Sequence, residues 1–186
     1  IKNKAFNKSK FILITNKKNK TIKKFFKTKN KKIEIIFYNS FNVLNLNAKI
    51  FKLFFIILKP FLFLLSILQM YKILKRLEFD ILLANCGGYG DFRSEMAGLI
   101  ANKILKNKKS FLLIHHCYSK PILWSSFVDL FNYLVARSVN GIIFVSRATK
   151  LSIKNNTSIL KNSTKNNIVI HNGIENKKFS KKKIAS

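Results

Sequence analysis

Two adjacent histidines, His115 and His116, are the residues whose type and position best suit chemistry. They close the apolar run Phe111–Ile114, which has the composition of a short buried strand. An imidazole at a strand end can hydrogen-bond a hydroxyl group or carry a proton near neutral pH. Because side chains alternate along a strand, the two rings should point to opposite sides, so at most one faces a given cleft. A structural role for either histidine is the alternative.

A glycine-rich loop follows the preceding apolar run, Phe79–Ala84. Gly87 and Gly88, with Tyr89 next to them, would let backbone amides approach a ligand at the start of the following helix. Asp91 is the expected N-cap of that helix. The loop lacks the spacing of a dinucleotide-binding fingerprint and has no P-loop lysine, so a tight turn that binds nothing is the alternative.

A third polar turn, Asn172-Gly173, comes after the apolar run Ile168–Ile170, and Ser146 comes after the run Gly141–Val145. Ser146 is expected to cap a helix, and Asn172-Gly173 to form a turn. In open α/β sheets, ligands bind beyond the carboxyl ends of the strands. The glycine loop, the histidines and the Asn-Gly turn are therefore predicted to line one edge of a sheet.

Other chemistries find little support in the residues. The sequence shows no nucleophile with a partnered base, which argues against a serine or cysteine hydrolase. No cluster of aspartate and histidine suggests a metal, and no cofactor is expected. Cys86 and Cys117 form neither a disulfide framework nor a zinc-binding spacing, so both are expected as small buried thiols at strand ends. A reducing cytosol is the expected compartment.

Alternating strand and helix patterns predict the elements that must position these residues. Such alternation is typical of a parallel sheet with right-handed crossovers, and it predicts a Rossmann-like three-layer α/β domain with a mainly parallel sheet. The expected strands are residues 11–15, 33–38, 79–84, 111–114, 141–145 and 168–170.

The longest apolar stretch, residues 48–76, has lysines within it and Pro60 near its middle. It is open to three interpretations. It could be a buried crossover helix that breaks near Pro60, an interfacial helix that lies on a membrane, or a transmembrane span near residues 51–70. The strand that follows belongs to the βα repeat, which favours the first two.

The net charge of +29 invites a nucleic-acid hypothesis, because basic proteins gain affinity for phosphates by releasing counterions. Nearly all of this charge comes from lysine, and arginine, the better phosphate ligand and stacker, occurs at only four positions. Lysine, asparagine, isoleucine and phenylalanine enriched together indicate a coding bias. No specific nucleic acid is therefore expected as a partner, but the charge favours anionic surfaces, including acidic lipid headgroups.

The stretch Phe79–Phe179 resembles the later part of the N-terminal domain of a glycosyltransferase family 4 enzyme of the GT-B fold. Two of the matches are the strand that begins at Phe79 and the strand that ends in His115. The others are Ile142–Ser146 and Ile168–Glu175, the second of which has His171 where the family more often has proline and Glu175 where it more often has aspartate. The basic residues before Phe179 also fit the pattern.

The resemblance implies sugar transfer from a nucleotide-activated donor to a glycan or lipid-linked acceptor, usually with retention at the anomeric carbon. Residues 1–175 would form the acceptor-side domain, expected to be truncated at its front, and residues 176–186 would begin the linker to a donor-binding domain. His115 would be the cleft histidine. The implied substrate-binding residues are Gly87, Gly88, Tyr89, His116, Asn172 and Gly173.

This resemblance leads to a cytoplasmic hexosyltransferase-like enzyme, associated with the cytoplasmic face of the membrane through peripheral contact and inactive as this piece alone. Two alternatives stay open. One is a small basic module that binds nucleic acid, which would need aromatic residues interleaved with lysine on one exposed face. The other is a membrane-anchored protein with its span near residues 51–70.

Overall fold

The structure is a computed structural model of the whole chain, and it has the alternating strands and helices that the sequence predicts. It describes residues 10–17, 33–39, 49–87, 93–106, 108–118, 125–157, 159–162 and 166–171.

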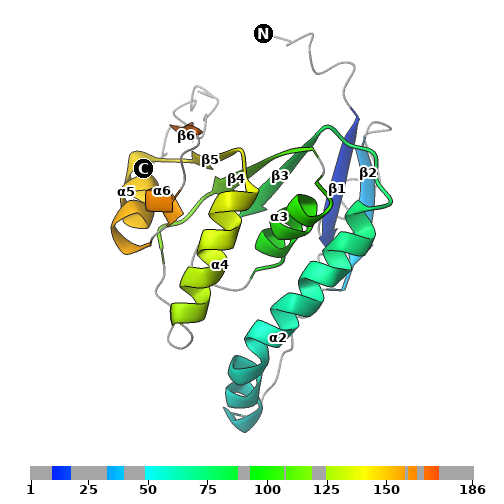
Figure 1. Cartoon of the computed structure of the whole chain (residues 1–186), viewed down its shortest axis with the longest axis horizontal. Helices are drawn as coiled ribbons and strands as arrows, with labels where there is room; N and C mark the ends of the chain where they lie inside the picture. The colour runs from blue at the N-terminus through cyan, green and yellow to red at the C-terminus, as the bar shows by residue number, and fades with distance from the viewer. Residues whose placement is uncertain are drawn as a thin grey trace, which may run out of the picture.

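The parallel strands of the described chain fall into two sheets (Figure 1). β1 (Phe11–Asn16) pairs with β2 (Ile33–Tyr38), and this pair forms a sheet of its own. The larger sheet contains four strands in the order β3-β4-β5-β6, all parallel. Its strands are β3 (Ile81–Cys86), β4 (Lys109–Ile114), β5 (Gly141–Phe144) and β6 (Asn166–Val169). Strands that follow one another in the chain are neighbours in the sheet, as short crossover connections require.

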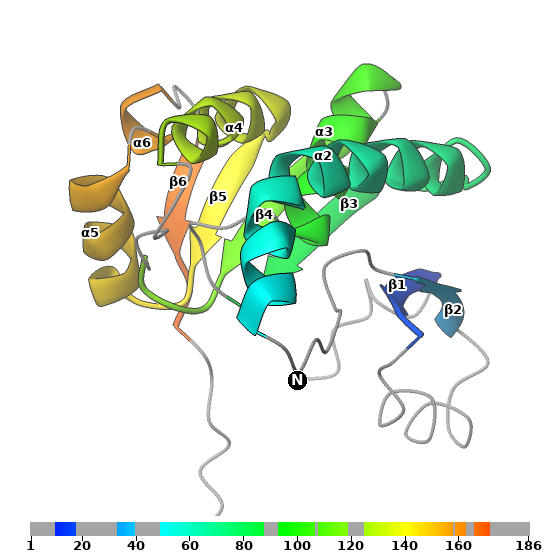
Figure 2. The ribbon, with the colours of Figure 1, turned by 90° about the horizontal axis from the view of Figure 1, so that it is seen from below.

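Helices supply the crossovers, and Figure 2 shows α2, α3 and α4 together on one face of the larger sheet. The helices are α2 (Lys49–Leu74), α3 (Ser94–Ile104), α4 (Ser125–Ser138), α5 (Arg147–Asn156) and α6 (Ile159–Asn162). The chain is an α/β protein with parallel strands. This architecture is consistent with the Rossmann-like three-layer domain that the sequence predicts.

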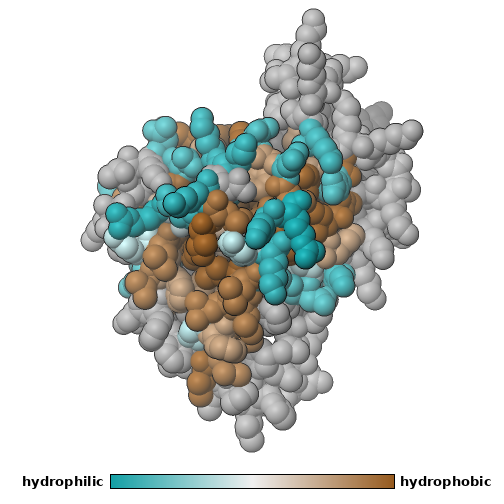
Figure 3. Space-filling view, turned by 45° about the vertical axis from the view of Figure 1, so that its right-hand side comes forward, coloured by the Kyte–Doolittle hydropathy of each residue, from teal (hydrophilic) through white to brown (hydrophobic). Residues whose placement is uncertain are grey.

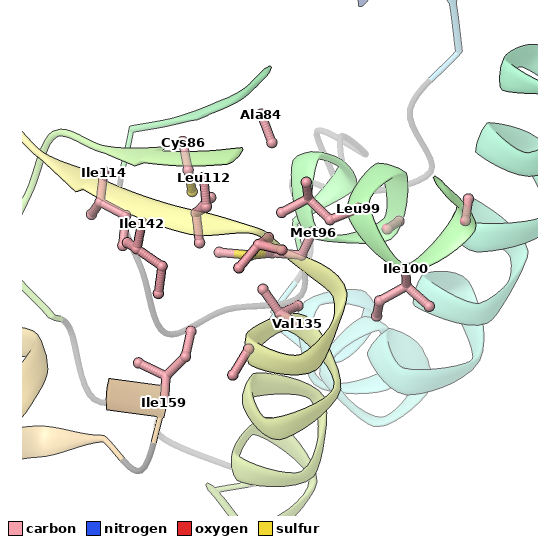
Figure 4. Close-up of a cluster of buried hydrophobic side chains, with 14 of the residues drawn as sticks. Ala84, Cys86, Met96, Leu99, Ile100, Leu112, Ile114, Val135, Ile142 and Ile159 are labelled. Carbon is pink, nitrogen blue, oxygen red and sulfur yellow. The ribbon is translucent and has the colours of Figure 1, made fainter. Parts of the chain in front are cut away.

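The core lies between the larger sheet and these helices (Figure 4). Alternate residues of each strand point into it, as the period of a strand requires: Leu112 and Ile114 of β4 are fully buried there. α3 contributes Leu99, and Ile142 of β5 lies beside the β4 residues. On the opposite face of the sheet, alternate apolar residues are exposed among the described residues: Ile81, Leu83, Ile168 and Ile170.

α2 is one continuous helix with Pro60 inside it, so the expected break near Pro60 is wrong. A proline removes one backbone donor from the helix ladder, but it does not oblige the helix to end when packing holds the turns beside it. Here the packing comes from residues on one face of α2, including Phe63 and Leu74, which are almost fully buried. The ring of Phe63 meets Phe131 of α4 edge to face, with centroids 4.8 Å apart. This face makes α2 a crossover helix that is fixed to the core.

Candidate functional site

The carboxyl ends of the four strands of the larger sheet are aligned by backbone hydrogen bonds that continue just beyond each strand. His115 N donates to Cys86 O at 3.1 Å, Val145 N donates to Ile114 O at 3.3 Å, and Ile170 N donates to Phe144 O at 2.8 Å. The segments that follow the strands therefore all begin at the same edge of the sheet. This edge is the place where parallel α/β sheets bind ligands, and we call it the carboxyl edge.

His115 leaves β4 at this edge, and its imidazole contacts Asn85 of the neighbouring strand. His115 Nε2 lies 2.7 Å from Asn85 Oδ1. Because an amide oxygen only accepts, Nε2 carries the proton in this arrangement, and Nδ1 of the neutral ring is left as an acceptor. In this arrangement the amide favours the tautomer with the proton on Nε2 and orients the ring. A hydroxyl group of a ligand could donate to Nδ1.

Asn85 is a site residue that sequence reasoning missed. The sequence predicts a strand that ends at Ala84 and places Asn85 in the glycine loop, whereas β3 extends through Cys86. Register explains the contact with His115: Asn85 is opposite Leu113, and His115 comes two residues after Leu113 on the same side of the sheet. Ala84 and Cys86 are both buried, so the alternation of the strand continues past its predicted end, but this burial shows only in the structure.

His116 and Gly87 are neighbours at the same edge. A Cβ atom built on Gly87 would lie 3.9 Å from His116 Cδ2, which is ordinary van der Waals contact. His116 is exposed, whereas His115 is partly buried. The two rings thus have different neighbours, as alternation along a strand leads one to expect. Gly87, His115 and His116 are the predicted site residues that the structure brings together.

Ser146 caps α5, as the sequence predicts. Its side-chain oxygen accepts a hydrogen bond from Thr149 N at 3.0 Å and lies 2.9 Å from Thr149 Oγ1. The backbone of Ser146 is extended, which is the usual conformation of an N-cap residue. Its hydroxyl is therefore engaged in starting a helix at the carboxyl edge.

Arg93 is the N-cap residue of α3, so the expectation that Asp91 caps this helix is wrong. Arg93 has an extended backbone, its carbonyl accepts from Met96 N and Ala97 N, and it makes no side-chain cap bond. Hydrogen bonding of the helix begins at this residue because it is the last one with an extended backbone. Arg93 Nε is buried and has no hydrogen-bond partner among the described residues. Arg93 is thus placed at the start of α3, the helix that follows β3, with the Nε end of its side chain buried.

The first turn of α3 is also joined to the smaller sheet. The hydroxyl of Tyr38, the last residue of β2, donates to Ser94 Oγ at 2.7 Å. Burial raises the pKa of Tyr38, the bond to Ser94 lowers it by less, and the negative charge of Glu95 raises it further. This hydrogen bond connects the β1–β2 pair to the helix that begins at the site.

Four of the predicted site residues, Gly88, Tyr89, Asn172 and Gly173, lie outside the described residues. Of the two cysteines, Cys86 is buried in β3 as expected, but Cys117 is exposed. The expectation for Cys117 is wrong because β4 ends at Ile114, so Cys117 is in the segment beyond the strand. Within the described part of the chain, no three of the side chains that commonly bind metals gather in one place.

A cavity of about 550 Å³ lies at the opposite edge of the larger sheet, where α3 and α4 end and β4 begins. Its described lining is basic and polar, with exposed lysines and two buried side chains, Asn102 and Ser138. Asn102 Nδ2 donates to Lys108 O at 3.0 Å, which shapes the turn between α3 and β4. The residues that line the cavity are Asn102, Lys103, Lys106, Lys108, Lys109, Ser138 and Asn140. This cavity is distant from His115 along β4 and contains none of the predicted site residues.

Comparison with models of protein families, with curated proteins and with solved structures gave no match to this chain.

Proposed function

We propose that this chain is the acceptor-side domain of a glycosyltransferase of the GT-B type, similar to family 4. The reaction is transfer of a sugar from a nucleotide-activated donor to a glycan or lipid-linked acceptor, with retention at the anomeric carbon. In this proposal the donor binds mainly to a second domain, and the protein works in the cytoplasm at the cytoplasmic face of the membrane. The sequence motifs from Phe79 to Phe179 suggest this family.

The observation that carries the proposal is the pairing of His115 with Asn85 at the carboxyl edge. An imidazole whose Nε2 donates to Asn85 can accept a hydrogen bond at Nδ1 from a sugar hydroxyl and so orient an acceptor. Gly87 and His116 lie beside this pair, and Gly87 lets backbone come close to a ligand. An acceptor-side domain needs a site of this kind, which binds and orients a hydroxyl-rich molecule.

Positive charge at the same edge fits an acceptor that carries phosphate. Arg93 precedes α3, and Arg147, which is exposed, follows Ser146 at the start of α5. A guanidinium can bind phosphate oxygens through two parallel hydrogen bonds. Prenyl-linked sugars are joined to their lipid through phosphate groups, so these arginines favour that class of lipid-linked acceptor over a free glycan.

Isothermal titration calorimetry with a short-chain prenyl diphosphate disaccharide tests the proposal. Free disaccharides and a set of nucleotide sugars serve as comparison ligands. We expect the lipid-linked disaccharide to bind and the nucleotide sugars to bind at least about tenfold more weakly. The nucleotide sugars lack the contacts that the second domain would supply, and a tenfold loss of affinity corresponds to about 1.4 kcal/mol. The proposal fails if the nucleotide sugars bind more tightly than the disaccharide.

Variants at the carboxyl edge sharpen this test. His115→Ala should weaken binding by up to about tenfold, the loss of one good hydrogen bond, and Asn85→Ala should weaken it less because Asn85 acts through the ring. The double variant should bind no more weakly than His115→Ala, since the two residues act as a unit. Lys109→Ala, at the opposite edge, is the control and should leave binding unchanged. Equal losses in all of these variants would contradict the assignment.

The basic cavity at the opposite edge favours a second candidate, a module that binds nucleic acid. Its lysines would attract phosphates, and affinity would fall steeply with salt. However, its described lining contains no aromatic side chain on which a base could stack. Titration of mixed oligonucleotides at several salt concentrations distinguishes the candidates. Micromolar or tighter binding at moderate salt, lost when Lys106 and Lys108 are replaced by glutamine, would favour this second function.

A further inference from the structure

The outward face of α2 carries a stripe of exposed apolar side chains that we call the α2 stripe: Ile57, Phe61, Leu64 and Leu68. Their exposed fractions are 54%, 58%, 50% and 58%, so each is at least half accessible. The spacing of four, three and four residues places them along one line of the helix. Figure 3 shows hydrophobic surface along this side of the molecule, with hydrophilic residues above it.

The α2 stripe is distinct from the face of α2 that packs into the core. The core face contains Phe63, Ile67, Met70 and Leu74, all buried. A helix of a soluble protein normally carries polar side chains on the face that points away from its core. Contiguous apolar surface in that position marks a surface that binds a partner or a membrane.

The same line of α2 continues into positive charge. Lys72 follows Leu68 at helical spacing, and Lys75 and Arg76 lie just beyond the end of the helix; all three are exposed. The whole of α2 contains no acidic residue. Among the described side chains, a surface that is apolar from Ile57 to Leu68 and positively charged after it fits the boundary between acyl chains and anionic headgroups.

Charge also argues against a second copy of the chain as the partner. The protein carries a net charge of +29, and α2 has no carboxylate that could face the lysines of another copy. Two such faces brought together would place like charges in a region of low dielectric, where repulsion is strong. The occupant must therefore be anionic as well as apolar.

We propose that the α2 stripe, with Lys72 and Lys75, is a docking surface for an anionic lipid bilayer. The helix lies in the plane of the membrane with the four apolar side chains inserted, while its core face stays packed on the protein. α2 is also long and apolar enough, between Ile57 and Leu74, to cross a membrane by length and composition. Docking differs from crossing, because the buried core face would lose its packing in a span. This inference does not depend on the proposed glycosyltransferase function.

Co-sedimentation with vesicles tests the proposal. The vesicles contain either phosphatidylcholine alone or phosphatidylcholine with about 30% phosphatidylglycerol, to supply the anionic surface. Because a basic protein binds any anionic vesicle through charge, the comparison is repeated in about 0.5 M NaCl, which screens such attraction. We expect the protein to bind the anionic vesicles. Part of this binding should persist in the added salt, because the inserted apolar side chains do not depend on charge.

Matched variants assign that salt-resistant part to the stripe. Leu64→Ser/Leu68→Ser should weaken it by about tenfold or more, the loss of two inserted leucines. The control is Leu83→Ser/Leu151→Ser, which removes two leucines of similar exposure, 51% and 55%, elsewhere on the surface. Lys72→Gln/Lys75→Gln should weaken binding at low salt by about tenfold or more. Circular dichroism confirms that each variant is folded.

Three results would overturn the proposal. Equal losses in the stripe variant and its control would show that the stripe is not the contact. Dimerisation at micromolar concentration that Leu64→Ser/Leu68→Ser abolishes would make a second copy the occupant. Retention of the protein in membranes through alkaline carbonate extraction would show a true span, because a docked protein is released.

Discussion

Gly141 begins β5 where the backbone of β6 leaves no room for a side chain. A Cβ atom at this position would lie 2.7 Å from Asn166 O and 3.3 Å from Phe111 Cδ1. The first of these atoms belongs to the backbone of a paired strand, so it cannot move aside without opening the β5–β6 ladder.

We therefore expect Gly141→Ala to lower the free energy of unfolding by about 1–3 kcal/mol, the usual cost of overpacking a close contact. Gly98→Ala is the control, because nothing lies within 4 Å of a Cβ there and the residue is inside α3. That change should raise the free energy of unfolding by about 0.5–1 kcal/mol through helix propensity. Urea unfolding measures both, and a neutral Gly141→Ala would show that β6 is free to shift.

Tyr38 gives the fold a dependence on alkaline pH. Its pKa is raised in the folded protein, first by burial, so the unfolded chain releases this proton at a lower pH than the folded one. The resulting stability is present below the unfolded pKa, about 10, and is lost as pH rises through the folded value. Stability should begin to fall at about pH 9, where tyrosine of the unfolded chain begins to ionise, and should go on falling through the raised pKa of the folded protein.

Tyr38→Phe removes both the titrating group and its hydrogen bond to Ser94. At neutral pH the variant should be less stable by about 0.5–1.5 kcal/mol, the net value of one hydrogen bond. Above about pH 10 its stability should decline less steeply than that of the wild type, since this proton is no longer involved. Urea unfolding across this pH range checks the difference, and parallel declines would rule out Tyr38 as the group responsible.

At the scale of elements, α2 has a core face and an exposed face, and each carries one phenylalanine whose replacement tests the role of that face. Phe63 is almost fully buried and contacts Phe131 of α4, whereas Phe61 is exposed in the α2 stripe. Phe63→Ala should lower the free energy of unfolding by about 3–5 kcal/mol, and Phe61→Ala by less than about 1 kcal/mol. Vesicle binding should be weakened more by Phe61→Ala than by Phe63→Ala. The division of α2 is wrong if Phe61→Ala destabilises the fold as much as Phe63→Ala.

The order and type of most elements could be predicted from sequence because their apolar runs follow the period of a strand or a helix. β4, for example, ends at Ile114 as expected, with His115 directly after it. The extension of β3 through Cys86 could not be predicted in the same way, because it depends on pairing with β4, a contact between distant parts of the chain. For the same reason the partner of His115 was missed.

Local rules also failed where packing outweighed them. Pro60 predicts a break, but α2 continues through it, and the residues after it, including Phe63 and Leu74, pack on the core. Aspartate is a preferred N-cap residue, which predicts a helix start at Asp91, but the backbone of α3 becomes helical only after Arg93. Capping preferences are worth about 1 kcal/mol, which tertiary contacts readily exceed.

At the scale of the whole molecule, the two edges of the larger sheet have different characters. The carboxyl edge combines the Asn85–His115 pair with Gly87 and His116, whereas the opposite edge holds the lysine-lined cavity. A ligand rich in hydroxyl groups fits the first edge, and a simple polyanion fits the second. Where a ligand binds therefore decides between the two candidate functions more directly than how tightly it binds.

Mapping the bound ligand by NMR is the measurement that tests this account most directly. The ¹⁵N-labelled protein is titrated with the short-chain prenyl diphosphate disaccharide, and the backbone amide shifts are followed. We predict that the changes gather at residues 85–87, 115–116 and 145–147 and that His115→Ala needs up to about tenfold more ligand to produce them. Changes that gather instead at residues 102–109 and 138–140, unaffected by His115→Ala, would contradict an acceptor site at the carboxyl edge.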